Sequence, residues 1–199
     1  MKIIGITGGV GAGKSEVLKQ IGKMCRCVIV TADELAKSLE EPGEACYEPL
    51  VALLGDEILS GDGHIDKKKM AAKIFEDGTD KREAVNKIVH PAVKSRIIEM
   101  IADEKAKGYN DYFFIEAALL IEDHYDKIAD ELWYIYADEE VRRKRLKDSR
   151  GYSDERIDDI MDSQSSDAIF RAHCAVVIDN SRSLEDTREQ LNKIINTVR

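Results

Sequence analysis

The sequence has little proline, few cysteines and no long apolar run. Only 3 of its 199 residues are proline and 43% are hydrophobic, a composition typical of folded globular proteins. No apolar stretch approaches the roughly 20 residues that a membrane-spanning helix requires. The N-terminus has neither the length nor the cleavage site of a signal peptide. We therefore expect one cytoplasmic domain with no membrane segment, since domains commonly contain about 100–200 residues.

Basic residues are also in the minority. The chain has 39 acidic and 30 basic residues, which give a formal net charge of -9. This balance argues against broad affinity for nucleic acid, because such binding depends on basic surfaces that release counterions. Any anionic ligand must therefore be bound by a local group of positive charges.

The cysteines indicate neither a metal site nor a disulfide framework. The four are Cys25, Cys27, Cys46 and Cys174. Their single C-x-C pair has no second Cys or His pair to complete a tetrahedral site. We expect reduced thiols in or beside the core.

Five short apolar or aromatic runs predict β-strands. They are residues 3–7, 27–30, 112–115, 132–136 and 175–178. Apolar residues recur at helical spacing from Lys14 to Met24, which predicts a helix between the first two strands. A charged helical region follows at 138–172, and an amphipathic helix runs from about Leu184 to Val198. Strands that alternate with helices predict a three-layer α/β fold around a parallel sheet of five strands.

The stretch from Asp33 to Gly108 is predicted to be mostly helical. Turn or helix-boundary signals interrupt it at Glu41-Pro42-Gly43, Ser60-Gly61-Asp62-Gly63, Asp77-Gly78 and His90-Pro91. We interpret residues of about 34–108 as a helical insertion in a core of about 1–33 and 109–199. Its position suggests a region that holds a substrate, although a packing role explains it equally well.

A glycine-rich loop provides the strongest chemical signal. Residues Gly8 to Ser15 satisfy the pattern G-x-x-x-x-G-K-[ST] between a predicted buried strand and a predicted helix. Glycines let successive N–H groups turn inward around phosphate oxygens at the positive end of a helix. Lys14 would reach the terminal phosphates of ATP, and the Ser15 hydroxyl would bind the accompanying Mg²⁺. The predicted nucleotide-binding residues here are Gly8, Gly9, Gly11, Ala12, Gly13, Lys14, Ser15 and Glu16.

Two other interpretations of this loop are weaker. It could be a turn without a ligand, or the G-x-G-x-x-G fingerprint of dinucleotide-binding proteins. Neither requires the Lys14-Ser15 pair that follows the glycines. We therefore expect an ATP-dependent kinase of small molecules.

Asp33 is the candidate catalytic base. It directly follows the second predicted strand, and the carboxyl ends of parallel strands line the ligand crevice of open α/β sheets. A carboxylate there could accept the proton of an acceptor hydroxyl. Alternatively, Asp33 caps the next helix, since Asp is a favoured N-cap residue.

A dense basic run predicts a lid over about 142–172. It comprises Arg142, Arg143, Lys144, Arg145, Lys147 and Arg150. Arginine suits phosphate oxygens and can stabilise charge on a transferring phosphoryl group. The alternative is a solvated helix face paired with the neighbouring acidic residues. We favour a catalytic role for Arg145 and surface positions for Arg142, Arg143 and Lys144.

Over almost its whole length the chain resembles the dephospho-coenzyme A kinases, which have the P-loop kinase fold. The similarity lies in residues 7–15, Thr31-Ala32-Asp33 with Leu35-Ala36, His90-Pro91, 119–122, Gln164 and 177–180. It implies phosphorylation of the ribose 3′-hydroxyl of dephospho-CoA by ATP with Mg²⁺. It also implies Asp33, Lys14 and Arg145 as catalytic residues and Asn180 as a nucleotide contact. The implied substrate residues are Thr7, Asp33, His90, Leu120 and Glu122. We expect a monomer.

Three positions depart from the family pattern. Glu16 replaces a threonine beside the loop, which could weaken nucleotide binding, and Ala118 replaces a proline before the paired leucines. In the lid, Ser149 stands where a second arginine is usual, and Arg150 comes one residue late. The departure in the lid leaves open which arginine contacts the phosphates.

Two rival functions remain. The first is another P-loop kinase, such as one for nucleotides or shikimate, and the Asp33 and His90-Pro91 segments argue against it. A nucleotide-binding switch that hydrolyses ATP usually has an acidic Mg²⁺ ligand at the end of a hydrophobic strand, and Ile115-Glu116 is the nearest approach to one. Turnover that depends on an added acceptor would distinguish a kinase from a switch.

Overall fold

Five strands form one sheet in the order β2-β3-β1-β4-β5. The computed structural model describes residues 1–76 and 80–197. The strands are β1 (Lys2–Thr7), β2 (Cys27–Thr31), β3 (Tyr112–Glu116), β4 (Glu131–Tyr136) and β5 (Val176–Asp179). β1 runs parallel to both β3 and β4, and β4 runs parallel to β5. The predicted α/β fold with five strands is confirmed, and each predicted strand agrees with an observed one to within one or two residues.

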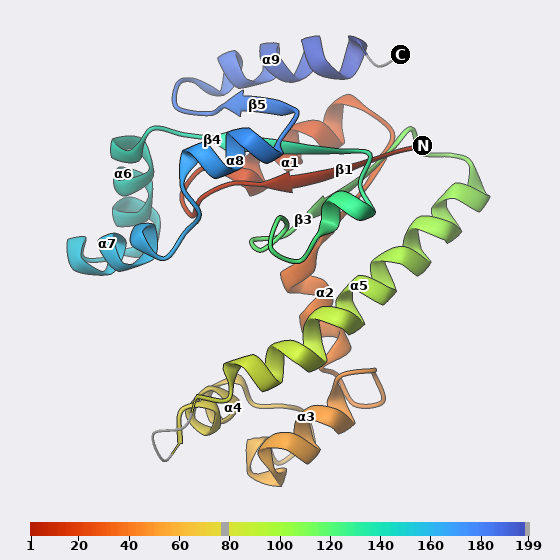
Figure 1. The fold of residues 1–199 in the computed structure, drawn as a ribbon, viewed down its shortest axis with the longest axis vertical. Coiled ribbons are helices and arrows are strands. Elements are labelled where there is room, and N and C mark those ends of the chain that lie inside the picture. Colours follow the sequence, from red (N-terminus) through yellow and green to blue (C-terminus); the bar gives the residue numbers. More distant parts are fainter. Residues whose placement is uncertain (77–79, 198–199) are drawn as a thin grey trace. The chain divides into compact units, whose positions relative to one another are not determined.

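Helices cover both faces of this sheet. On one face, α1 (Lys14–Met24) and α9 (Leu184–Thr197) contact each other, and α9 lies along β5 (Figure 1). The core there combines Val17 and Ile21 of α1 with Ile4, Phe114 and Trp133 of the strands, none of them exposed to solvent. On the other face, the ring of Phe170 in α8 (Asp167–His173) stacks on Tyr134 at 4.7 Å. The sheet is therefore the middle of three layers, as predicted.

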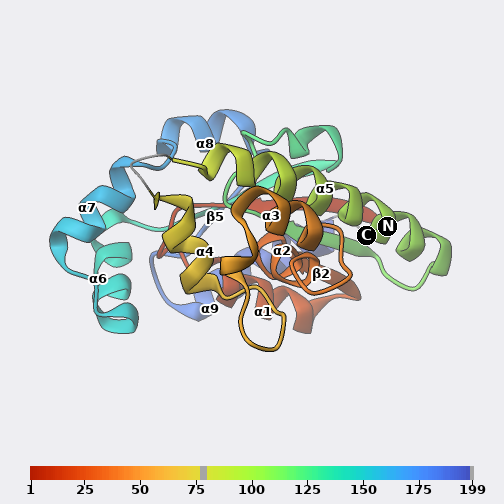
Figure 2. The same ribbon diagram turned by 90° about the horizontal axis from the view of Figure 1, so that it is seen from below.

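The chain divides into two compact units, Met1–Val30 with Glu104–Arg199, and Thr31–Asp103. The first unit also contains η3 (Tyr125–Lys127), α6 (Glu139–Arg150) and α7 (Asp154–Asp162). The second contains α2 (Ala32–Leu39), α3 (Tyr47–Leu54), η1 (Asp56–Ile58), α4 (Lys67–Ile74) and most of α5 (Arg82–Lys107) (Figure 2). The predicted break at Asp77-Gly78 and the predicted helix end at Val198 lie outside the described residues.

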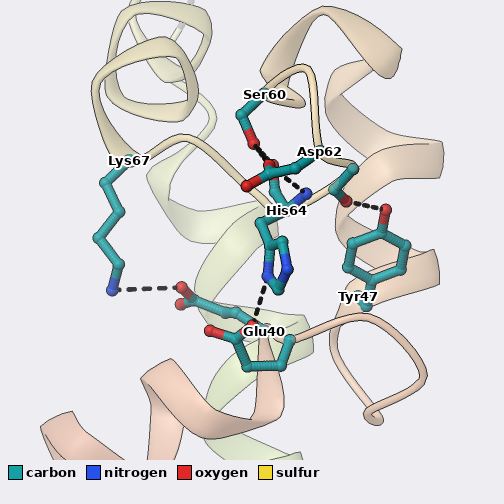
Figure 3. Close-up of polar contacts among 8 residues, drawn as sticks. Glu40, Tyr47, Ser60, Asp62, His64 and Lys67 are labelled. Carbon is teal, nitrogen blue, oxygen red and sulfur yellow. Dashed lines mark hydrogen bonds and ion pairs between the residues drawn. The ribbon is translucent and has the colours of Figure 1, made fainter.

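Polar contacts fix the turns of the second unit. The turn at 60–64 is tied to the segment after α2, because His64 Nδ1 lies 2.7 Å from Glu41 Oε2, and to the start of α3, because the Tyr47 hydroxyl donates to Gly63 O at 2.5 Å (Figure 3). Lys67 Nζ lies 3.6 Å from Glu40 Oε2. The predicted breaks at Glu41-Pro42-Gly43 and at 60–63 are both confirmed as turns.

The predicted helix boundary at His90-Pro91 is wrong. α5 continues through Pro91, and His90 is itself helical. Proline removes one helical hydrogen bond and its ring crowds the carbonyl four residues earlier, here that of Lys87. Pro91 is exposed, so water can solvate that carbonyl, while Val93 and Ile97 are buried on the other side of the helix. Burial of this apolar face outweighs the local cost of the proline.

Replacing Pro91 with alanine is therefore expected to stabilise the protein. The change restores a helical N–H and removes the ring, which together should raise the free energy of unfolding by about 1–3 kcal/mol. The greater conformational freedom of the unfolded alanine variant offsets a smaller part of this gain. Urea denaturation measures the difference. The exposed Asn86→Ala in the same helix is the control, because it changes helix propensity alone. A Pro91→Ala protein less stable than the wild type would contradict this account of α5.

The four cysteines all lie within the described residues, and they form no disulfide. Cys46 and Cys174 are buried, as predicted for thiols in the core, and burial raises the pKa of Cys174 to about 11. Burial and the neighbouring Cys25 raise the pKa of Cys27 to about 12. Among the described residues, no helix has the length and apolar character needed to cross a bilayer.

Candidate active site

The glycine-rich loop, residues 8–13, connects β1 to α1, as the sequence predicts. Gly13 precedes the first residue of α1 in a left-handed conformation, with φ of 89°. A side chain at Gly13 would be strained there and would also collide with the amide of Asn180. The helix thus begins at Lys14, and the N–H groups of Glu16 and Val17 both donate to Gly13 O. A helix that begins directly after a glycine-rich loop is a typical anion-binding arrangement.

Lys14 lies at the mouth of this loop. Its ammonium group donates to Gly8 O at 2.8 Å and lies 3.6 Å from Glu116 Oε1. Both side chains are largely buried, with 14% and 17% of their surface exposed. The strand register pairs Ile6 with Glu116, which explains how the last residue of β3 comes to lie beside the loop. Only a weak sequence signal marks Glu116, because its proximity to Lys14 depends on this register.

Arg142 and Gln164 hold the tip of the loop together. Arg142 Nε donates to Val10 O at 2.9 Å, and its Nη2 donates to Gln164 Oε1 at 2.6 Å. The same amide oxygen accepts from the Val10 N–H at 3.2 Å. Burial lowers the pKa of Arg142 from its usual value. The predicted surface position of Arg142 is therefore wrong, because this arginine is half-buried against the loop. The basic run gave no signal that could separate it from its neighbours.

Arg145 contacts the opposite side of the loop. Its Nη1 donates to Ala12 O at 3.3 Å and its Nη2 donates to Asn180 O at 2.8 Å. Asn180 is 5% exposed and donates its own amide to Ala12 O at 2.8 Å. Thr187 donates to Asn180 Oδ1 at 2.9 Å. The family resemblance implies Arg145 as a catalytic residue and Asn180 as a nucleotide contact, and both are thus brought together on the carbonyl of Ala12.

The other basic residues of α6 lie away from the loop. Arg143 pairs with Glu139 at 2.8 Å and with Asp158 at 2.5 Å, and Lys144 is exposed. The Ser149 hydroxyl donates to Arg145 O within its own helix, at 2.6 Å. Arg150 lies over the ring of Tyr152, 5.8 Å from its centroid. Residues 142, 145 and 149 share one helix face, so Arg150 does not occupy the position left by Ser149.

Several hydroxyl and carboxyl groups lie at or near the loop. Thr7, the last residue of β1, is fully buried, and its hydroxyl has no partner among the described residues. Ser15 is exposed in the first turn of α1. Glu16 accepts a hydrogen bond from Gln20, which also accepts from Arg188 at 3.0 Å. The Glu16 carboxylate therefore forms a hydrogen bond with a residue one turn later in α1.

These groups fit a magnesium ion. Mg²⁺ prefers hard oxygen ligands such as hydroxyl, carboxylate and phosphate oxygens. The Ser15 hydroxyl and the carboxylate of Glu116, beside Lys14, offer such oxygens near the glycine-rich loop. No cluster of three or more Cys, His, Asp or Glu residues suited to a metal occurs within 1–76 and 80–197. A metal at this loop would therefore take most of its ligands from bound phosphate and water.

Two further expected substrate residues of the first unit, Leu120 and Glu122, lie in the turns after β3. Leu120 is fully buried, whereas Glu122 is exposed and accepts a hydrogen bond from the Ser165 hydroxyl at 2.8 Å. Ser165 directly follows Gln164, the residue that contacts the tip of the loop. Glu122 is thus connected through neighbouring residues to the loop, although it does not contact the loop itself.

The remaining predicted residues, Asp33 and His90, belong to the second unit. Asp33 is exposed in the first turn of α2, and Thr31 occupies the N-cap position without a side-chain capping bond. Asp33 is therefore not the N-cap of α2, which removes the alternative structural interpretation of this residue. No ion pair or side-chain hydrogen bond of Asp33 occurs in the described part of the chain. His90 is half-buried on α5.

Comparison with known proteins places this geometry in a family context. The model of the dephospho-CoA kinase family matches residues 2–186. A dephospho-CoA kinase of Carboxydothermus hydrogenoformans is 34% identical over 199 residues, covering 98% of this chain and 93% of its own. One from Oceanobacillus iheyensis is 32% identical over 193 residues, covering 97% and 96%.

Solved structures show the same fold. A Thermus thermophilus protein superposes with a TM-score of 0.79 at 25% identity, covering 100% of this chain and 98% of its own. Dephospho-CoA kinase from Campylobacter jejuni gives 0.74 at 21% identity, with the same coverage. Shikimate kinase from Acinetobacter baumannii gives 0.53 at 14% identity, covering 100% and 93%. The fold is therefore that of the P-loop kinases, as predicted.

Proposed function

The chain belongs to the dephospho-CoA kinase family, and we propose that it transfers the γ-phosphoryl group of ATP to the ribose 3′-hydroxyl of dephospho-CoA. The products are CoA and ADP, and the reaction is the last step of coenzyme A biosynthesis. One observation carries the proposal: the family match spans nearly the whole chain and includes a fully formed phosphate-binding loop. Shikimate kinases share the fold alone, at far lower identity.

The loop binds the triphosphate in this proposal. N–H groups at the start of α1 bind phosphate oxygens, and the Lys14 ammonium moves from Gly8 O toward the terminal phosphates. Mg²⁺, held through Ser15 with Glu116 nearby, would neutralise charge on the phosphates. Arg145 and Asn180 support this role of the loop by holding the carbonyl of Ala12. Phosphoryl transfer depends mainly on such positioning and electrostatic stabilisation.

Asp33 is the proposed general base. As the acceptor oxygen attacks the γ-phosphorus, its proton passes to the Asp33 carboxylate while the bond to the ADP oxygen breaks. Its exposure supports this role, because an exposed carboxylate is accessible to the hydroxyl of a bound acceptor. Thr7, His90, Leu120 and Glu122 are the proposed contacts of the acceptor, by resemblance to the family.

An ATP-hydrolysing switch is the second candidate, and one observation favours it. Glu116 ends a hydrophobic strand 3.6 Å from Lys14, where a switch would have its acidic Mg²⁺ ligand. A switch would hydrolyse ATP without an acceptor, whereas a kinase needs the acceptor for turnover.

The proposal is tested with the purified full chain, ATP and Mg²⁺ against a panel of acceptors. The panel contains dephospho-CoA, shikimate and nucleoside monophosphates, with a sample lacking any acceptor. We expect ADP release that depends on dephospho-CoA, and a product with its new phosphate on the ribose 3′-oxygen, identified by ³¹P NMR. Turnover with another acceptor only, or equal ADP release without an acceptor, would refute the substrate assignment.

A further inference from the structure

The contacts around Val10 point to Arg142 as a positioning residue for the phosphate-binding loop. We infer that Arg142, acting with Gln164, sets the affinity of this chain for the nucleotide by fixing the backbone of Val10 before the nucleotide binds. The inference deepens the proposed function, because it assigns a role within the same nucleotide site.

Both polar backbone groups of Val10 form hydrogen bonds with the side chains of Arg142 and Gln164. The carbonyl accepts from Arg142 Nε at 2.9 Å, and the N–H donates to Gln164 Oε1 at 3.2 Å. A third hydrogen bond of 2.6 Å joins Arg142 Nη2 to the same Gln164 oxygen. Because the three bonds form a closed triangle, the peptide groups on both sides of Val10 have a single preferred orientation. A loop held in this way loses less conformational entropy when it binds phosphate.

The two side chains come from separate parts of the chain. Arg142 lies in the first half of α6, which follows β4, whereas Gln164 follows α7 and is 22 residues away. Leu146, one turn after Arg142, is buried, and it would contact a side chain placed at Gly11. Since α6 packs against the loop through Leu146, the helix backbone positions Arg142 beside the loop.

Gly9 gives a second, independent observation. A Cβ atom added at Gly9 would overlap the guanidinium of Arg142, which lies directly against this residue. Gly9 is not among the glycines with a positive φ, so its backbone conformation would accept alanine. The three atoms nearest to such a Cβ all belong to the Arg142 guanidinium, so an alanine here would have to displace that group. The loop and the arginine therefore fit one another sterically as well as through hydrogen bonds.

A purely structural role for Arg142 predicts a different result from a positioning role. If Arg142 only stabilised the fold, its loss would lower thermal stability and affect both substrates alike. If it positions the loop, its loss weakens binding of the nucleotide and spares the acceptor. Separate measurement of the two KM values, and of ADP binding alone, distinguishes the two roles.

The experiment compares Arg142→Ala with Arg143→Ala in the full chain. Arg143 is the adjacent residue of α6 and, within the described residues, pairs with the exposed carboxylates of Glu139 and Asp158, so its variant controls for lost charge. We expect Arg142→Ala to raise the Kd for ADP with Mg²⁺ and the KM for ATP by about ten- to a hundredfold, as for lost hydrogen bonds from a charged donor. The KM for dephospho-CoA should change less than about threefold. An unchanged Kd for ADP would overturn the inference.

Two further variants cover the case in which Arg142→Ala folds poorly. Gly9→Ala displaces the guanidinium without deleting it, and Gln164→Leu removes the shared acceptor. Each should weaken ADP binding, and combining either with Arg142→Ala should add little, because all three break one network. Fully additive effects on the Kd for ADP would refute the proposed network. ADP binding needs no acceptor, so these outcomes are separate from a failure of dephospho-CoA to act as substrate.

Discussion

Replacing Asp33 with asparagine is expected to lower kcat with dephospho-CoA by about 10²–10⁴-fold while ATP and ADP still bind. Asparagine keeps the size and polarity of the side chain but cannot accept a proton, which removes the contribution typical of a general base. The fold should tolerate the change, because Asp33 is exposed and Thr31, not Asp33, occupies the N-cap of α2. Steady-state kinetics combined with calorimetric titration of ADP measures both effects.

Glu34→Gln is the matched control for this prediction. Glu34 is the next residue in the first turn of α2 and is also exposed, so its variant makes the same change of charge at the same helix terminus. It should retain nearly full activity. If Asp33→Asn kept more than about half of the wild-type kcat, or if both variants lost activity equally, Asp33 would not be the base.

Local sequence signals were sufficient for most of the fold. Apolar runs such as residues 112–115 are buried on both faces of the sheet, so their composition alone identifies strands. The start of α1 was equally predictable, because Gly13-Lys14-Ser15 determines both the turn and the first helical residue. In these places the local preference and the tertiary environment agree.

Prediction failed where tertiary packing overrides a local preference. Pro91 signals a helix end, but burial of Val93 and Ile97 keeps α5 continuous through it. Arg142 and Arg143 are adjacent and chemically identical, yet one lies against the loop and the other pairs with exposed carboxylates. Only the orientation of α6 on the loop separates them. A single sequence contains no information about that orientation.

Glu116 shows the same limit within the site. The residue ends a strand and could be exposed, structural or functional, and nothing in its neighbours decides between these. The pairing of Ile6 with Glu116 brings its carboxylate to 3.6 Å from Lys14. The positive charge of Lys14 is therefore partly balanced by the Glu116 carboxylate before any phosphate binds.

Replacing Lys14 with methionine is accordingly expected to lower kcat/KM for ATP by about 10²–10³-fold, the loss typical of one group that stabilises transition-state charge. Methionine retains most of the apolar stem but cannot donate to a phosphate. It also leaves the largely buried Glu116 carboxylate without the ammonium group 3.6 Å away, where it would repel phosphate. In the absence of Mg²⁺, the double variant Lys14→Met with Glu116→Gln should therefore bind ADP more tightly than Lys14→Met alone, without recovering kcat.

The exposed Lys19 of the same helix provides the control, since Lys19→Met removes an equal charge at a distance from the loop and should change kcat/KM little. Kinetics at varied ATP, with ADP binding by calorimetry, gives each quantity. Two results would count against this account. Activity of Lys14→Met within about tenfold of wild type would mean that Lys14 does not stabilise the transferring group. Equal ADP affinity of the single and double variants would mean that Glu116 exerts no field on the bound phosphates, and Lys14 would then act alone.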